Sequence, residues 1–272
     1  MSTQESNLAW VLLTLVVLAT PSLPLAAAGP PAPAGEGRTF ALVINGDAAA
    51  KHRGNVALAL EVLGRMGVSA DRLYVLSGTP EAPQTGPAAH YLRPTWASVK
   101  GVTKDLAAAI DADDTLIVYT TGHGAWDGGV PVLLLDGETV SARELTRRLL
   151  AIGFGRLIFV ADQCYSGAFV RELERSQRDV VAISATDAAH EVRCIYFSRP
   201  FWRALERQEK AGRPVTAVAS LRAAFATAVE SLRASSPGEK SHARFVTTSA
   251  TAADTDAVAD ATQDGGAAAP AG

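Results

Sequence analysis

The sequence predicts an α/β fold in which a mostly parallel sheet of about six strands carries helices on both faces. Leu157–Ala161 and Thr115–Thr121 are nearly continuous apolar runs, as in strands buried on both sides of a parallel sheet. Such runs alternate along the chain with segments whose apolar residues recur at helical spacing. The 272 residues, 48% of them hydrophobic, are enough for one good-sized core.

The first half of the domain contains three of the expected strands: Phe40–Ile44, Leu73–Leu76 and Thr115–Thr121. A helix over Val56–Met66 is expected between the first two, because Gly67 suits the position after a helix end. Residues 77–94 are rich in Pro, Gly, Thr and Ala and predict a long loop. Thr95 is then the expected N-cap of a helix that runs to Ile110.

The second half continues the alternation. Its expected strands are Val132–Leu135, as a hairpin or edge strand, Leu157–Ala161, Val180–Ala185 and a closing strand over Arg244–Thr247. The capping box Ser141-Ala142-Arg143-Glu144 predicts a helix that ends near Gly153. Two further amphipathic helices are expected over Phe201–Glu209 and Thr216–Leu232.

The ends of the chain differ in composition from the domain. An apolar run, a Pro-containing segment and a small-residue stretch follow one another in residues 1–28, which predicts a signal peptide and a secreted or periplasmic protein. Its first residues are atypical, since they carry Glu5 and no Lys or Arg. Residues 29–38 are a Pro/Ala/Gly linker, residues 39–250 the folded domain, and residues 251–272 an Ala/Asp-rich tail expected to be disordered. No stable membrane span is expected after signal cleavage.

Several classes of function are not indicated. The net charge of −3 gives no concentrated basic face for nucleic acid. Five histidines and two cysteines show no zinc-type spacing, so no metal site is predicted. The turn Asn45-Gly46-Asp47 lacks the glycine spacing of a phosphate or dinucleotide loop, and no cofactor is expected. Ser166 lacks the Gly-x-Ser-x-Gly pattern of serine hydrolases.

Two strand ends carry residues that suit nucleophilic catalysis. Thr115–Thr121 runs into Gly122-His123-Gly124, and Leu157–Ala161 runs into Asp162-Gln163-Cys164. Parallel sheets place working residues at the carboxyl ends of their strands, so both turns are expected at one edge. A cysteine is nucleophilic as the thiolate, and a nearby imidazole can supply the base that forms it.

The two motifs together resemble a known family. Residues 119–124 (YTTGHG) and 160–167 (VADQCYSG) look like the His and Cys motifs of caspase-fold cysteine peptidases, closest to the legumain type. The resemblance extends to residues 44–67, to residues 182–187 and to residues 197–205. It implies a caspase-like three-layer sandwich and a peptide or protein substrate.

The resemblance also implies roles for individual residues. His123 would be the general base and acid, Cys164 the nucleophile, and the amides of Gly124 and Cys164 the oxyanion donors. A pocket for the residue before the cleaved bond (P1) would be lined by residues from three segments: Asp162, Lys51, His52, Ser184 and Asp187.

The sequence departs from the family at two places. Legumain-like enzymes place an asparagine that orients the histidine just before an Arg-His pair, whereas Ala49 precedes Lys51 and His52 here. Asn45 and Asn55 are candidates to replace that asparagine. Lysine does not offer the bidentate recognition of arginine, so the P1 preference stays open between Asn/Asp and Arg/Lys.

The sequence therefore predicts a secreted cysteine endopeptidase. Two alternatives remain: a transpeptidase or ligase on the same scaffold, and a non-catalytic caspase-like binding module. Cys194 is expected to be a buried free thiol, the alternative being a Cys164–Cys194 disulfide.

Overall fold

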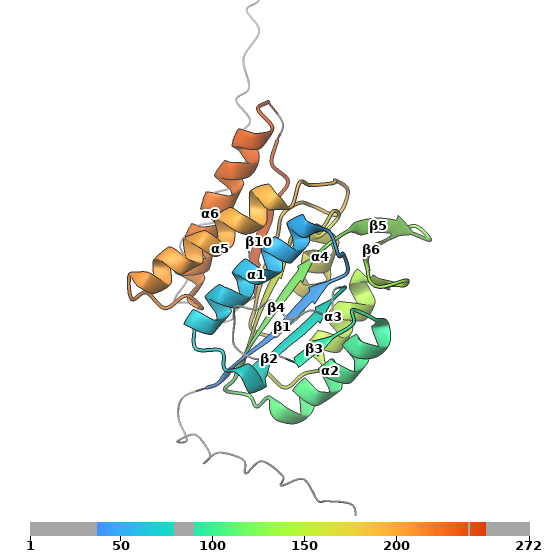
Figure 1. Ribbon diagram of the computed structural model, residues 1–272, viewed down its shortest axis with the longest axis vertical. Coiled ribbons are helices and arrows are strands. Elements are labelled where there is room, and N and C mark those ends of the chain that lie inside the picture. The colour runs from blue at the N-terminus through green and yellow to red at the C-terminus, as the bar shows by residue number, and fades with distance from the viewer. Residues whose placement is uncertain (1–36, 79–89, 239, 249–272) are drawn as a thin grey trace, which may run out of the picture. The chain divides into compact units, whose positions relative to one another are not determined.

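The computed structural model describes residues 37–78, 90–238 and 240–248 and has a seven-stranded sheet at its centre (Figure 1). The strands of this sheet are β1 (Thr39–Asn45), β2 (Leu73–Ser77), β3 (His90–Leu92), β4 (Thr115–Thr121), β8 (Arg156–Ala161), β9 (Val180–Ser184) and β10 (Arg244–Thr247). Across the sheet their order is β10-β9-β8-β4-β1-β2-β3. Neighbouring strands are parallel, except that β10 runs antiparallel to β9.

Helices cover both faces of the sheet. The described residues form six α-helices: α1 (Ala50–Arg65), α2 (Trp96–Ala109), α3 (Ala142–Leu150), α4 (Gly167–Glu174), α5 (Ile195–Lys210) and α6 (Val218–Ser235), besides a short 3₁₀ helix at Ala70–Arg72. One hydrophobic core joins the sheet to α2, α3 and α4, and a second joins its other face to α1, α5 and α6. The predicted α/β fold with a mostly parallel sheet is confirmed, and it is consistent with a caspase-like sandwich.

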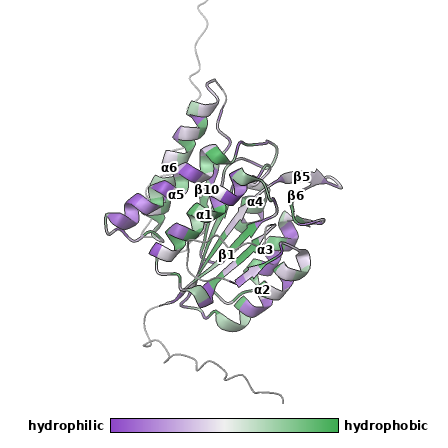
Figure 2. Ribbon diagram, viewed as in Figure 1, coloured by the Kyte–Doolittle hydropathy of each residue, from purple (hydrophilic) through white to green (hydrophobic). Residues whose placement is uncertain are grey.

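The alternation of side chains along β1 shows why both faces are buried. Phe40, Leu42 and Ile44 belong to the first core, whereas Ala41 and Val43 belong to the second. All five side chains are almost fully buried, which explains the uninterrupted apolar run in the sequence. Figure 2 shows the same distribution, with hydrophobic residues gathered on the central strands and more polar residues on the helices.

A small antiparallel sheet follows β4. It consists of β5 (Gly124–Asp127), β6 (Val130–Leu134) and β7 (Thr139–Ser141), and β5 and β6 extend to one side of the main sheet in Figure 1. Gly128 and Gly129, both with positive φ, form the turn between β5 and β6. The hairpin predicted around Val132–Leu135 is thus present, and its first strand begins directly after His123.

Two of the predicted helix starts are confirmed by their caps. The Thr95 side chain accepts a hydrogen bond from the Ser98 amide at the start of α2, and Ser141 and Glu144 form a reciprocal capping box at the start of α3. Helix α1, however, begins at Ala50 and not at the expected Val56. The first turn of α1 is polar, so the apolar periodicity becomes visible only about one and a half turns after the helix begins.

The elements that were not predicted include the short strand β7, the strand β3 and the helix α4. β3 lies inside the expected loop 77–94, where its three residues pair with β2 and the ring of His90 stacks on Tyr74 at 4.6 Å. Three residues are too few for a recognisable strand pattern. Helix α4 follows the cysteine turn and has eight residues, about two turns, which is short for a helical period to be recognised.

The ends of the chain lie outside this description. The predicted signal peptide, nearly all of the linker and the predicted tail fall in residues 1–36 and 249–272, which are not among the described residues. None of the helices in the described part is long and apolar enough to cross a membrane.

Phe159 tests the core under α4. Its side chain on β8 is fully buried and stacks against Phe169 at 6.1 Å between ring centroids. Phe159→Ala should lower the free energy of unfolding by about 3–5 kcal/mol in urea denaturation, because the lost contacts leave a cavity. Val130→Ala, at a side chain 48% exposed on β6, should change it by no more than about 0.5 kcal/mol. Equal effects of the two changes would contradict the assigned core.

Candidate active site

The histidine and cysteine turns meet at one edge of the sheet. β4 and β8 are adjacent parallel strands, with Thr120 paired to Ala161 at their carboxyl ends. Directly beyond these ends, a Cβ added to Gly124 would lie 2.0 Å from the carbonyl oxygen of Cys164. The backbones of the two turns therefore touch, and position 124 has no room for a side chain. The structure brings the predicted His123, Gly124 and Cys164 segments together.

Cys164 is half-buried and its thiol contacts the backbone of Val192. The Val192 N–H donates to Sγ at 3.4 Å, and Sγ–H donates to the Val192 carbonyl at 3.7 Å. Burial raises the pKa of Cys164 above its ordinary value, and the bond from the Val192 amide opposes this only in part. The thiol is therefore neutral near pH 7, and its use as a nucleophile requires a base.

The turn that carries Cys164 is held in an unusual backbone conformation. Tyr165, the next residue, has φ of +60°, a left-handed conformation that is uncommon for residues other than glycine. Its amide donates to the carbonyl of His190, and the Gly167 amide donates to the carbonyl of Asp187. The segment that follows β9 therefore fixes the cysteine turn.

Asp47 lies beside His123. The turn after β1 places its Oδ2 3.0 Å from His123 Nε2, while the imidazole ring itself is 53% exposed. Asp47 is held in place because its Oδ1 accepts the Ala49 amide at 2.9 Å and its own amide donates to Asn45 Oδ1 at 3.1 Å. The carboxylate of Asp47 therefore faces Nε2 of the His123 ring.

The sequence indicates Asn45 and Asn55, and not Asp47, as candidates to orient His123. Asn45 donates to Ser77 Oγ and accepts the Asp47 amide. Asn55 donates to Asp162 and to the Cys194 sulfur. Neither of these asparagines has a hydrogen bond to His123 in the described structure. The sequence signal for Asp47 was an acid in the turn after β1, but only the pairing of β1 with β4 brings that turn next to His123.

His52 lies on the buried side of the first turn of α1. Its Nε2 is 3.3 Å from Asp47 Oδ2, and its Nδ1 is 3.3 Å from Thr121 Oγ1. Burial lowers the pKa of His52 to about 4, although the charge of Asp47 opposes this shift. His52 is therefore neutral at physiological pH. The neighbouring Lys51 is exposed, and its charge acts on both cysteines.

Asp162 is fully buried beneath the cysteine turn. Its Oδ2 accepts hydrogen bonds from Tyr119 at 2.6 Å, from Asn55 at 3.4 Å and from Ser198. Its Oδ1 has no hydrogen-bond partner among the described residues. Burial raises the pKa of Asp162 to about 6, against the opposing effect of the hydrogen bonds to Ser198 and Tyr119.

Ser184 and Asp187 lie at the end of β9, next to β8. The buried Ser184 hydroxyl donates to the Thr186 carbonyl, and Asp187 accepts from the Ala189 amide and from the His190 ring at 2.8 Å each. Burial acts to raise the pKa of Asp187, but these hydrogen bonds outweigh it and hold the pKa below its usual value. Both residues share the sheet edge of Cys164, and the side-chain hydrogen bonds named here run within the loop after β9.

The remaining cysteine is not part of a disulfide. Both cysteines of the chain are free, and Cys194 is a buried free thiol as predicted. It lies beside His52 and Asn55. Burial, aided by the charge of Asp162, raises the pKa of Cys194 to about 12, so it is an inert thiol.

A cavity of about 530 Å³ adjoins the site. Val192, which contacts Cys164, lines it together with the loop after β9, the end of α6 and residues 240–242. The exposed Trp126 on β5 is also close to the cysteine turn, because its ring centroid lies 6.0 Å from that of Tyr165. Neither feature was expected from the sequence, because exposed aromatic and loop residues follow no periodic pattern.

Comparison with known proteins identifies the family. Residues 97–212 match the model of the Peptidase C13 family, so this part of the chain is a legumain-type domain. The match includes His123, Asp162 and Cys164 but not the β1–α1 segment with Asp47 and His52. No curated protein matches the chain. Membership of this family implies a cysteine peptidase with protein substrates.

Asp47 can be tested as a positioning residue. Asp47→Ala should lower kcat for peptide cleavage by about 10- to 100-fold with little change in KM, a part of the 10²–10⁴ that a general base contributes. Asp47→Asn keeps an oxygen for His123 and should restore most of that loss. Steady-state kinetics of both variants, with circular dichroism as the folding control, give the answer. Equal loss in both variants, or a change in KM alone, would contradict the positioning role.

Proposed function

We propose that this chain, whose residues 97–212 form a Peptidase C13 domain, is a cysteine endopeptidase with Cys164 as nucleophile and His123 as general base. The contact between Gly124 and the Cys164 carbonyl carries the proposal, because it brings the two reactive turns together at the carboxyl edge of the sheet. The position of Asp47 beside His123 supports it.

The proposed reaction starts with a proton transfer. With Asp47 favouring a proton on Nε2, the lone pair on His123 Nδ1 takes the proton from the Cys164 thiol. The thiolate then attacks the peptide carbonyl carbon, and the imidazolium returns its proton to the leaving amine as the C–N bond breaks. The product is a thioester on Cys164. Water, deprotonated by His123, hydrolyses it and regenerates the thiol.

The oxyanion formed during attack needs donors. We assign this role to the backbone amides of Gly124 and Cys164, which belong to the two touching turns. One such donor typically contributes about 10²–10³ in rate. The absence of a side chain at position 124 also leaves space for the substrate backbone.

The P1 pocket is proposed to involve Asp162, with Lys51, His52, Ser184 and Asp187 nearby. The unpartnered Oδ1 of Asp162 supports this role, since a buried oxygen without a hydrogen-bond donor can accept a hydrogen bond from a substrate side chain. An ionised Asp162 suits Arg or Lys at P1, and a protonated Asp162 can bond to an Asn side chain.

Resolution of the thioester by an amine would make the same site a transpeptidase or ligase. A pure binding module is disfavoured, because such a module has no use for the His123 and Cys164 turns in contact. Export by a signal peptide in residues 1–28 remains part of the proposal.

Replacement of the proposed nucleophile and base is the direct test. Cys164→Ala and His123→Ala should each lower kcat/KM for peptide cleavage by at least about 10³-fold while the fold is kept. Cys194→Ala is the matched control and should retain cleavage within about threefold, because its buried thiol has a pKa of about 12. The assay is cleavage of a P1-diverse peptide library, with amine acceptors added to detect ligation. Full activity of Cys164→Ala would refute the assignment.

The raised pKa of Asp162 predicts that the P1 specificity depends on pH. Because its folded pKa of about 6 lies above the ordinary 3.8, folding favours the protonated form; this stabilisation is complete below pH 3.8 and is lost as pH rises through 6. The ratio of kcat/KM for Arg-P1 over Asn-P1 peptides should therefore rise between pH 5 and 7, by about tenfold.

Asp162→Asn provides the control for this dependence. The variant should flatten the ratio and also remove the fall in unfolding free energy across the same pH range, because its amide does not titrate. A ratio that is constant with pH in the unmodified protein would contradict a pocket role of Asp162.

A further inference from the structure

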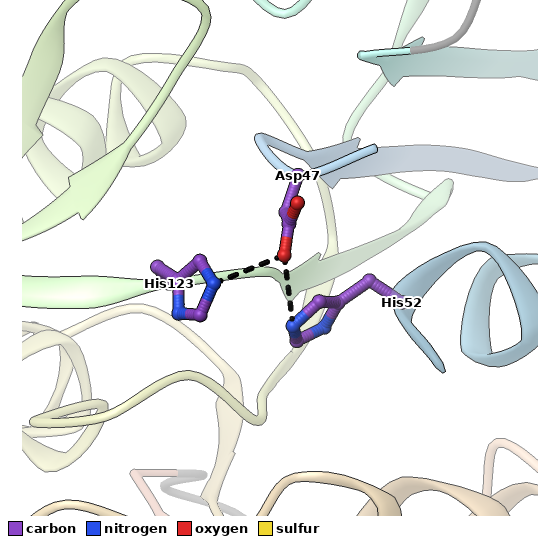
Figure 3. A group of neighbouring side chains, drawn as sticks. All are labelled: Asp47, His52 and His123. Carbon is purple, nitrogen blue, oxygen red and sulfur yellow. Dashed lines mark ion pairs between the residues drawn. The ribbon is translucent and has the colours of Figure 1, made fainter. Parts of the chain in front are cut away.

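Asp47, His52 and His123 bring three metal-type donors together from three segments of the chain. Asp47 lies in the turn after β1, His52 in the first turn of α1 and His123 in the turn after β4. One donor atom from each lies within 4.8 Å of the other two. Figure 3 shows the Asp47 carboxylate between the two imidazole rings, with one oxygen directed at a nitrogen of each.

The spacing of these donors fits a tetrahedral ion. Ligand atoms about 2.0–2.2 Å from a tetrahedral zinc lie roughly 3.3 Å from one another. Asp47 Oδ2 is 3.0 Å from His123 Nε2 and 3.3 Å from His52 Nε2. Only small side-chain shifts would place all three atoms around one ion.

Two of the donor atoms lack a hydrogen-bond partner. His52 is 1% exposed, yet its Nε2 has no partner with hydrogen-bond geometry in the described structure, and neither has the buried Asp47 Oδ2. The two atoms are close together but not aligned as donor and acceptor. Buried polar atoms are normally paired, so such a pair of orphans is expected where a further group binds.

The surroundings hold the donors in place. Thr121 Oγ1 lies 3.3 Å from His52 Nδ1 and can accept its proton, which leaves Nε2 free as a ligand. The Ala49 amide occupies the other oxygen of Asp47. His123 is 53% exposed, so an ion can enter from solvent and a water molecule can complete four-coordination.

We propose that Asp47, His52 and His123 form a zinc site that inhibits the peptidase. Two imidazoles with one carboxylate suit Zn²⁺ and not Mg²⁺ or Ca²⁺, which prefer oxygen ligands. A zinc ion on His123 Nε2 would place positive charge on the ring and so disfavour the imidazolium that must form when Nδ1 takes the proton of Cys164. The inhibitory effect rests on the proposed function, whereas binding of the ion does not.

A second cluster of the same residue types provides the comparison. Asp187, His190 and His242 also lie within reach of one ion. However, the Asp187 oxygens are engaged by the Ala189 amide and by both rings, and none of the three residues is fully buried. This cluster is stabilised by its own contacts and serves as the control.

The binding experiment uses the full chain with Cys164→Ala, which removes the cysteine sulfur as a competing ligand. Isothermal titration with Zn²⁺ and the visible spectrum with Co²⁺ should show one tetrahedral site. A further His52→Gln change should weaken zinc binding by more than about tenfold, since even the loss of an outer-shell partner weakens binding by 10–100-fold. His190→Gln should leave the affinity unchanged.

Specific results would overturn the proposal. These are unchanged affinity in His52→Gln, loss of binding in His190→Gln, or loss of the site in Cys164→Ala relative to the unmodified chain. Should His52→Gln fail to fold, the isosteric Asp47→Asn gives the same test, because an amide oxygen is a weaker ligand than a carboxylate.

Measuring peptide cleavage in the presence of zinc separates the zinc site from the proposed peptidase function. If the unmodified protein cleaves peptides, zinc should inhibit it with an inhibition constant equal to the dissociation constant from titration, and a chelator should restore activity. If it cleaves none, the titrations still decide whether the site binds zinc, while the peptidase assignment fails. Cleavage that is unaffected at saturating zinc would overturn the inhibitory role.

Discussion

The close contact between Gly124 and the carbonyl of Cys164 is the constraint on which the candidate site depends. Parallel pairing of β4 and β8 brings two turns to the same edge, but pairing alone leaves the distance between the turns open. The contact fixes that distance, because a Cβ at position 124 would lie 2.0 Å from the carbonyl oxygen and force the turns apart. A glycine after the histidine is thus a packing requirement of the candidate site.

Asp47 adds an electrostatic constraint to this packing. A partly buried carboxylate is unfavourable unless polar groups face it, and here two imidazoles and a backbone amide do so. Burial keeps His52 neutral, so the charge of Asp47 is not cancelled by a nearby imidazolium and remains available to His123. The lone pairs of Asp47 that would orient His123 are the ones that would bind a metal ion. Asp47 cannot do both at once.

The residues that the sequence predicted correctly belong to regular patterns. The buried strands follow from continuous apolar runs, and α2 and α3 follow from their caps. Asp47 was missed because its contact with His123 depends on the strand order, in which β1 lies beside β4 although β2 and β3 separate them in sequence. His52 lay outside the helix expected over Val56–Met66, because the first turn of α1 is polar and shows no apolar periodicity. No local pattern reports such contacts.

The resting state of Cys164 follows from these constraints taken together. Burial disfavours the thiolate, and the Val192 backbone contacts Sγ through both its amide and its carbonyl. The loop that carries Val192 also holds the cysteine turn through the amides of Tyr165 and Gly167. In the proposed reaction, a substrate carbonyl that reaches Sγ must therefore compete with Val192, while the proton leaves toward His123. Under this proposal, formation of the thiolate would be coupled to substrate binding, and the neutral thiol of the free protein would be protected from unproductive reactions.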